Sequence, residues 1–526
     1  MGLRRARALD VPVGLQQPVG VDLRVTVEGL PAYMTAEPLT IPAGASAGVL
    51  IMRATEGAPL GVPSQVRVRA AGAGQPAEAV LEAWVQGEPG TLDETFGEGG
   101  IVVGPAMASL AGIAPLPDGS LVAVGNSDNK RVMLVHHLAD GQPDPAFGDQ
   151  NNSGPVVFYA PPSASPNVYA DEEEARAAAV QPDGKVVIFG IRTQLERASS
   201  SGEIQIKGYQ WHVSRHLAQG TLDAAFGEGG AASFSDGVAA PVGAKAAEFD
   251  TPLGGIAVAG DGTLVIAARD SYDPASPYRL LRLTPGGKAD ETFGQAGFVR
   301  GPQIACRPTS VVVSPGGDVV VGGNKADGQG REQACVARFL PTGAPDLAFG
   351  DQGSRALPVL QREGVLYERA LGVAVDDEGA VLGGFTRGQN SSDTILLAKL
   401  LGDGAYDASF GQGGRATQIP SFLATDSALR VTAVVRSAWS GDLIAAQQVV
   451  TDGSFGGVSP LALNVAKYDA KGGLVQAFGT GGATEIPINA GQAYLFRNVR
   501  LAEDAGGRIL IAGVQDGTQR IARLWP

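Results

Sequence analysis

The amino-acid sequence predicts an all-β protein, a seven-bladed β-propeller preceded by a small β-sandwich. Three observations support this prediction. A motif of the form LDxxFGxGG recurs along most of the chain, short apolar runs and tight turns follow each copy, and glycine accounts for 75 of the 526 residues, roughly twice its usual share. Many short strands joined by glycine turns are typical of such a composition, and long helices are not.

The motif occurs seven times and places seven of the 17 phenylalanines in one position of the repeat. We expect each ring to be a wedge between neighbouring blades, because burying a phenylalanine stabilises a fold by roughly 1.5–3 kcal/mol. The flanking glycines are then needed where the chain reverses between blades. The seven phenylalanines are Phe96, Phe147, Phe226, Phe293, Phe349, Phe410 and Phe478.

Each repeat contains four short β-forming runs. In the first repeat they are Gly100–Val103, Ala111–Leu116, Leu121–Val124 and Val132–Leu138, with the turn Pro117-Asp118-Gly119 between the second and third. Glycine in such turns accepts a positive φ without a Cβ clash. Seven four-stranded repeats over 90–526 indicate a β-propeller, since a solenoid uses shorter repeats and separate sandwiches need about 100 residues each.

A basic residue near the end of the last run of each repeat, followed by an aspartate in the next motif, predicts a belt of structural basic–aspartate contacts. A ring of charged ligands is the functional alternative. Closure of the propeller would bring Arg523 to Asp93. The basic residues are His137, His216, Arg282, Arg338, Lys399, Lys467 and Arg523, and the other aspartates are Asp144, Asp223, Asp290, Asp346 and Asp407.

Repeats of the form LDxxFGxGG, followed by PDGxxVVxG and a basic–apolar pair, resemble the bacterial delta-sixty repeats. That family is described as a β-propeller of unknown function, typical of exported or surface proteins. The resemblance extends over 90–526 and implies a secreted or cell-envelope protein. It supplies no catalytic residues.

Residues 9–88 lack the repeat and contain alternating runs such as Val21–Val27 and Gln65–Ala70. They predict the small sandwich and resemble bacterial Ig-like modules with the pattern VxGLPxxxTxxPLTIPAG. Such domains usually need about 100 residues, so we expect this one to be truncated. Residues 1–8 are interpreted as a leader or its remnant, with a signal or lipoprotein leader missing upstream.

The second repeat has the longest predicted loops, Tyr159–Arg176 and Arg192–Gln210, which would lie on the variable face of the propeller. Aromatic side chains on loops stack on sugars or peptides, and the acidic run Asp171–Glu174 lies in the same region. The alternative is that these side chains cover their own loops. The candidate binding residues are Tyr159, Tyr169, Tyr209 and Trp211.

The two cysteines, Cys306 and Cys335, belong to one blade and one face. A disulfide is feasible if their Cα atoms lie within about 7 Å, and it would indicate an oxidising compartment; two buried free thiols are the alternative. Among the four histidines, a zinc site from His136 and His212 is not implied by their positions.

The sequence contains no HExxH or DxDxDG motif, and its GxSxG match, Gly44–Gly48, is not interpreted as a nucleophile elbow; no catalytic residue, metal or cofactor is predicted. A net charge of −14 argues against a nucleic-acid partner, and no apolar stretch is long enough for a transmembrane segment. The leading hypothesis is a non-catalytic binding or scaffold protein for a surface protein or a glycan. The alternatives are a glycan lyase or hydrolase acting at the central funnel and a purely structural module.

Overall fold

The computed structural model describes residues 2–526 except for a set of internal segments. These are 73, 75, 129–130, 149–155, 160–167, 198–203, 235–253, 270–277, 301–305, 327–331, 358–364, 377–378, 389–393, 417–427, 453–457 and 487–496. All named elements of the described chain are β-strands, and none of its segments is a helix long and apolar enough to cross a membrane. The chain divides into an N-terminal unit, Met1–Gly100 with Leu524–Pro526, and a main unit, Ile101–Arg523.

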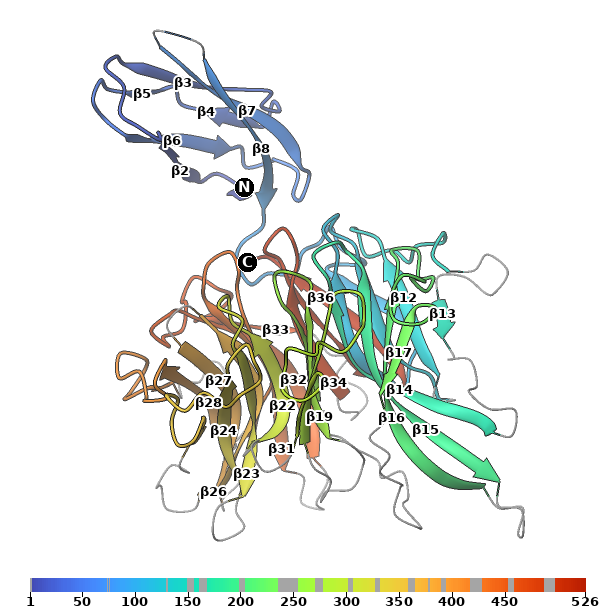
Figure 1. Cartoon of the computed structure of the whole chain (residues 1–526). Coiled ribbons are helices and arrows are strands. Elements are labelled where there is room, and N and C mark those ends of the chain that lie inside the picture. The colour runs from blue at the N-terminus through green and yellow to red at the C-terminus, as the bar shows by residue number, and fades with distance from the viewer. Residues whose placement is uncertain are drawn as a thin grey trace. The chain divides into compact units, whose positions relative to one another are not determined.

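The N-terminal unit contains two sheets, drawn in blue in Figure 1. Their buried side chains, including Leu50 and Met52 from one sheet and Val66 and Val85 from the other, form one core. The first sheet is ordered β1 (Gly2–Arg4), β8 (Ala77–Gln86), β7 (Ser64–Ala71), β3 (Leu23–Glu28) and β5 (Leu39–Ile41), and the second β2 (Ala8–Gly14), β6 (Ala47–Ala54) and β4 (Met34–Ala36).

The segment 1–8, interpreted from the sequence as a leader or its remnant, contributes to this core. Strand β1 pairs parallel with β8, Leu3 lies opposite Val85, and Leu3 is fully buried. Removing an apolar side chain from water in this way stabilises the sandwich. The boundary predicted at residue 9 is therefore corrected to include β1.

The main unit contains seven four-stranded sheets in its described part, numbered here in chain order. Sheet 1 is β10 (Ser109–Pro115), β11 (Leu121–Asn126), β12 (Val132–His137) and β13 (Val156–Tyr159); sheet 2 is β14 (Val168–Val180), β15 (Val186–Arg197), β16 (Ile204–His216) and β17 (Ala231–Phe234); sheet 3 is β18 (Gly254–Val258), β19 (Leu264–Arg269), β20 (Tyr278–Leu283) and β21 (Phe298–Arg300); sheet 4 is β22 (Arg307–Val313), β23 (Val319–Ala326), β24 (Glu332–Phe339) and β25 (Ser354–Ala356). Sheet 5 is β26 (Val365–Val375), β27 (Gly379–Gly388), β28 (Thr394–Leu401) and β29 (Arg415–Ala416); sheet 6 is β30 (Ala428–Arg436), β31 (Leu443–Asp452), β32 (Val458–Tyr468) and β33 (Ala483–Ile486); sheet 7 is β34 (Arg497–Glu503), β35 (Ile509–Gln515), β36 (Thr518–Leu524) and β9 (Ile101–Ala106).

The position of the motif differs from the prediction. It joins the third and fourth strands of one sheet instead of joining two blades: in sheet 1 the motif around Phe147 lies between β12 and β13, which pair with each other. The glycine turns of the motif therefore reverse the chain within a sheet. Sheet 7 takes its fourth strand from the beginning of the main unit, with Val102 of β9 opposite Ile521 of β36.

The motif phenylalanines are buried, and five of them lie against the next sheet. In sheet 3, Gly287 has φ +83°, and a Cβ atom there would approach the Phe226 ring of sheet 2 to 2.7 Å. A hydrogen bond accompanies this contact, since Gly227 N donates to Gly286 O at 2.8 Å. Phenylalanine and glycine thus form one joint between neighbouring sheets, as a wedge requires.

The basic–aspartate contacts have a different register from the predicted one in sheets 1 and 2. The aspartate partners are His136, whose Nδ1 lies 2.8 Å from Asp144 Oδ2, and Arg215, which lies 2.8 Å from Asp223. A shift of one residue moves a strand side chain to the other face of the sheet. His137 and His216 accordingly lie on the other face, where their Nδ1 atoms contact the carbonyl oxygens of Gly141 and Gly220.

The remaining basic residues also contact carboxylates. Arg282 contacts Asp290, Arg338 contacts Asp346, and Lys399 contacts both Asp376 and Asp407. Lys467, whose motif has Val475 in the aspartate position, lies 3.2 Å from Asp442 instead. The contact between Arg523 and Asp93 stays a prediction; Arg523 Nη1 donates to Ala139 O of sheet 1 at 2.7 Å.

Candidate functional site

Sheet 2 has the longest set of strands in the described main unit. Its first three strands contain 13, 12 and 13 residues, and their ends extend past the neighbouring strands in Figure 1. The described parts of the segments predicted as loops, Tyr159–Arg176 and Arg192–Gln210, are therefore β-structure. Only 198–203 separates β15 from β16, and Arg197 pairs with Ile204 at the end of this hairpin.

The four predicted binding residues do not form one loop cluster. Tyr159 ends β13 in sheet 1, whereas Tyr169 and Tyr209 lie in β14 and β16 of sheet 2; their side chains lie outside the described part of the structure. Trp211 is 2% exposed and packs edge-on against Phe189, with ring centroids 5.3 Å apart. The Trp211 ring thus belongs to the core, which corrects its assignment as a binding residue.

A row of polar residues crosses sheet 2 and was not predicted. His212 of β16 lies opposite Gly190 of β15 and Ser233 of β17. Glu173 of β14 is opposite Arg192, but its side chain reaches the space beside Gly190. A Cβ atom at Gly190 would lie 3.2 Å from Glu173 Oε1, so glycine leaves the space that the carboxyl occupies. His212 Nδ1 contacts Ser233 Oγ at 2.9 Å, and His212 Nε2 lies 3.9 Å from Glu173 Oε2.

Burial dominates the electrostatics of this row. Burial raises the pKa of Glu173 to about 8, although the nearby charge of Arg192 acts to lower it. Burial also lowers the pKa of His212 to about 4, and the charges of Arg192 and His216 lower it further. Glu173 is therefore protonated and His212 neutral at pH 7. A general base needs a pKa near the working pH and hydrogen-bond reach of about 2.6–3.2 Å. At 3.9 Å the Glu173 and His212 side chains lie beyond that reach, so in this structure the row forms a buried polar network.

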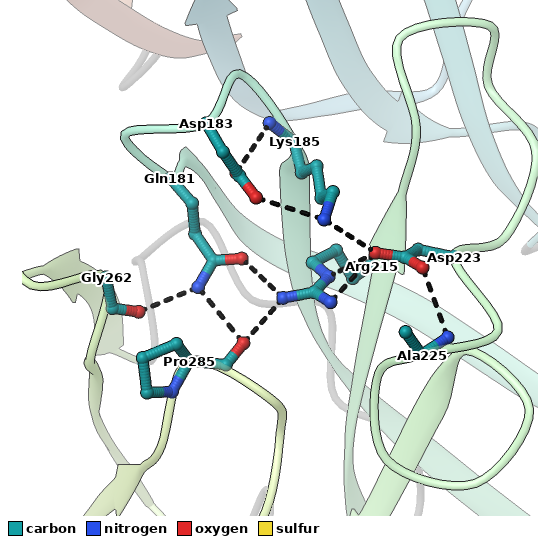
Figure 2. Close-up of polar contacts among 8 residues, drawn as sticks. All are labelled: Gln181, Asp183, Lys185, Arg215, Asp223, Ala225, Gly262 and Pro285. Atoms are coloured by element: carbon teal, nitrogen blue, oxygen red, sulfur yellow. Dashed lines mark hydrogen bonds and ion pairs between the residues drawn. The ribbon is translucent and has the colours of Figure 1, made fainter.

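A second polar network in the same sheet belongs to the basic–aspartate contacts (Figure 2). Arg215 Nε donates to Asp223 Oδ2 at 2.9 Å and Arg215 Nη1 to Gln181 Oε1 at 2.9 Å, while Lys185 lies 3.2 Å from the same aspartate. Gln181 Nε2 donates to Gly262 O of sheet 3 at 2.7 Å. Because these groups satisfy one another and join two sheets, the network is structural.

The first strands of all seven sheets line one cavity of about 260 Å³. Its described lining consists mainly of small and apolar residues, such as Gly112, Gly255 and Val434, and contains two arginines, Arg176 and Arg500. No carboxylate, histidine or tyrosine belongs to this described lining. The chemistry expected of a lyase or hydrolase at the central funnel is therefore not found in the part of the cavity that the structure describes.

The sequence analysis missed Arg500, although the repeat contains a signal for it. Gly112 in sheet 1 pairs with the fourth residue of β11, and Arg500 in sheet 7 pairs with the fourth residue of β35. The equivalent residue of sheet 5 is Gly372, which pairs with the fifth residue of β27 because that strand begins one residue earlier. Aligning the repeats by their turns would have shown a charged residue where the others are small. The full set is Gly112, Ala177, Gly255, Ser310, Gly372, Ala433 and Arg500.

Cys306 and Cys335 form a disulfide in sheet 4, with S–S 2.12 Å and Cα atoms 5.8 Å apart. Both residues are buried within the core shared with sheet 3. Among the described residues, no group of three histidine, cysteine, aspartate or glutamate side chains is placed to hold a metal ion.

The comparisons with known proteins agree with this architecture. A family model, "Domain of unknown function (DUF5122) beta-propeller", matches residues 259–293, which span β19, β20 and the motif up to Phe293. Comparison with curated protein sequences gives no match. The family match and the sheets identify the main unit as a β-propeller.

Solved structures give only distant likenesses. A Hadza microbial sialidase has a TM-score of 0.35 at 10% identity, covering 98% of this chain and 92% of its own. A glucose dehydrogenase has a TM-score of 0.34 at 15% identity, and the match covers 66% of this chain and 96% of the dehydrogenase. A Coprinopsis cinerea GH62 α-L-arabinofuranosidase has a TM-score of 0.26 at 13% identity, and the match covers 52% of this chain and 90% of that enzyme. Likenesses at this level support no inference about activity.

Proposed function

We propose that this chain is a non-catalytic binding protein of the cell envelope or the extracellular space. In this proposal a seven-bladed propeller with an N-terminal Ig-like domain, of the delta-sixty-repeat type, presents the extended end of sheet 2 to another surface protein or to a glycan. The observation that carries the proposal is the length of β14, β15 and β16, whose 13, 12 and 13 residues extend one end of the sheet.

Two further observations support this assignment. Insertions confined to one face of a repeat protein commonly belong to its binding face. The disulfide between Cys306 and Cys335 is typical of proteins that fold in an oxidising compartment. The rival function, a glycan-active enzyme at the central cavity, lacks support from the described lining, which contains neither paired carboxylates nor histidine.

The test shortens the hairpin of sheet 2 without changing its register. Arg192 and Gln210 are opposite each other, so Asn-Gly in place of 193–209 would reconnect them through a two-residue turn. The control replaces 387–393 in sheet 5 by Asn-Gly, which reconnects the opposed pair Thr386 and Thr394. Both variants should keep the far-UV circular dichroism and monomer elution of the parent.

Parent, trimmed and control chains are used as bait for envelope and culture-medium extracts of the source organism. We expect one partner to be recovered with the parent and the control and lost with the trimmed chain. Equal recovery with all three baits would contradict the assignment to sheet 2. Release of reducing sugar from a polysaccharide panel by the purified parent would favour the enzyme instead.

A further inference from the structure

Arg500 breaks the pattern of small residues around the central cavity. The six equivalent positions hold glycine, alanine or serine, and at Gly112 a Cβ atom would lie 2.9 Å from the Cβ of Ala178. Close packing of the first strands therefore explains the small residues. It does not explain a guanidinium, which follows a β-bulge in β34 where Asn498 has φ +55°. The side chain of Arg500 is directed along the cavity wall toward sheet 1.

The described contacts of Arg500 use only part of its hydrogen-bonding capacity. Nε donates to Ala111 O at 2.8 Å, and Nη1 donates to Val499 O at 3.2 Å. A guanidinium has five N–H donors, so three remain for other acceptors. Arg500 is half-buried and belongs to the lining of the cavity.

The charge of Arg500 has no carboxylate to balance it among the described residues. The other cavity arginine, Arg176, forms an ion pair with Glu174, whereas no acidic side chain pairs with Arg500 in the described chain. Burial lowers the pKa of Arg500 to about 10, which leaves the group charged at pH 7. An enclosed, unbalanced charge is costly and focuses an electrostatic field that attracts counter-ions.

We propose that the central cavity of the propeller binds one small oxyanion, a carboxylate or a phosphate, through the free N–H groups of Arg500. Two oxygens on one centre match the planar fork of a guanidinium. Ser310 lines the same cavity from sheet 4; its Oγ accepts from Val373 N at 3.3 Å, and its O–H remains available to donate. A volume of about 260 Å³ suits a small ion better than a drug-sized ligand.

The test is equilibrium dialysis of the full chain against radiolabelled phosphate and, separately, acetate, at pH 7.5 and constant ionic strength set with sodium chloride. We expect one bound oxyanion per chain, with affinity at least tenfold weaker in Arg500→Met. Arg415→Met, which removes a guanidinium that donates to Tyr406 in sheet 5, should bind like the parent. Preference for phosphate or for acetate identifies the class of ligand.

Binding of neither ion by the parent would overturn the proposal, and so would stoichiometric binding that Arg500→Met retains. If Arg500→Met does not fold, crystals of the parent grown with arsenate decide the matter: an anomalous peak beside Arg500 supports the site, and a peak elsewhere or none refutes it. The chain trimmed at 193–209 keeps Arg500 and should bind the oxyanion normally, so this inference stands or fails separately from the proposed function.

Discussion

Arg282 illustrates at the scale of one residue how neighbouring sheets are joined. Its Nε donates to Asp290 Oδ2 at 2.8 Å and its Nη2 to Thr292 Oγ1 at 2.8 Å, and its Nη1 donates to the carbonyl of Pro341 in sheet 4. The guanidinium also lies 4.7 Å from the centroid of Phe293. One side chain thus connects the third strand, the motif and the next sheet.

Replacement of Arg282 by methionine should destabilise the main unit by about 2–4 kcal/mol, because it leaves a partly buried carboxylate without its cation. Arg415→Met removes a guanidinium of the next-but-one sheet and serves as the matched control. We expect it to lose less stability than Arg282→Met, because Arg415 contacts the neutral Tyr406, through a hydrogen bond and a cation–π contact, whereas Arg282 pairs with a carboxylate. Urea unfolding monitored by circular dichroism measures both values. Equal losses would show that the contacts of Arg282 do not join the sheets.

Because Glu173 is buried, we expect the free energy of unfolding to depend on pH. The pKa of Glu173 is raised in the folded state to about 8, so its contribution is fully present below its ordinary pKa near 4.5 and is lost as the pH rises toward 8. Glu173→Gln cannot ionise and escapes this loss. The stability of the variant relative to the parent should increase from pH 5 to pH 8 by a few kcal/mol, since one pKa unit corresponds to about 1.4 kcal/mol. A pH-independent difference in melting temperature would contradict this.

At the scale of elements, a side-chain clamp joins the second strand of one sheet to the first strand of the next. The side chain of Asn324 in sheet 4 accepts a hydrogen bond from Ala370 N of sheet 5 at 2.8 Å and donates one to Ala370 O at 3.3 Å. Asn126 of sheet 1 makes the same pair of hydrogen bonds with Ala175 of sheet 2. Both contacts adjoin β-bulges in the first strand, at Ala370 and at Ala175. The asparagine satisfies backbone groups beside the bulge.

Asn324→Ala should therefore cost about 1–3 kcal/mol, because Ala370 N loses its acceptor. Ala370 O keeps the Thr309 hydroxyl as a donor, at 3.1 Å. Asn324→Asp keeps an acceptor for Ala370 N but no amide donor, and is its matched comparison. Chemical denaturation of the two variants gives the free energies of unfolding. A loss below about 0.5 kcal/mol in Asn324→Ala would show that water replaces the clamp.

The sequence predicted the turns, the four-stranded repeats and the phenylalanine position, because these depend on local residue patterns. It failed where partners are distant in the chain. Nothing local distinguishes a motif between blades from one within a sheet, so the strand after Phe147 was assigned to the wrong neighbour. His137 and His216 were predicted to contact the aspartates, because each directly precedes the last apolar residue of its run. The actual partners, His136 and Arg215, lie one residue earlier, and the local pattern does not distinguish these two strand registers.

The candidate site shows the same limitation. The polar stretch around Glu173 looked like a loop, since consecutive acidic residues lack the alternation of polar and apolar residues that is typical of a strand, although Glu173 itself is buried. Trp211 looked like a loop aromatic for the same reason, although it packs against Phe189. The pairing of β14 with β15 and β15 with β16 extends these strands, and such pairing is a property of tertiary structure.

At the scale of the whole main unit, its first and last strands complete one sheet. Strand β9 pairs with β36, and two arginines of sheet 7 reach sheet 1, since Arg523 donates to Ala139 O and Arg500 to Ala111 O. The ring is thus closed by hydrogen bonds and not by a covalent link. First strands of both joined sheets, β34 of sheet 7 and β10 of sheet 1, line the central cavity.

Closure is tested most directly by a cross-link between β9 and β36. Val102 and Ile521 are opposed, and opposed residues of antiparallel strands have Cα atoms about 4.5–5.5 Å apart, within the range for a disulfide. The double variant Val102→Cys/Ile521→Cys should form an intramolecular disulfide under mild oxidation, identified by peptide mapping alongside the bond between Cys306 and Cys335. It should also raise the melting temperature. Failure to cross-link, or cross-linking only between chains, would contradict a ring closed by β9.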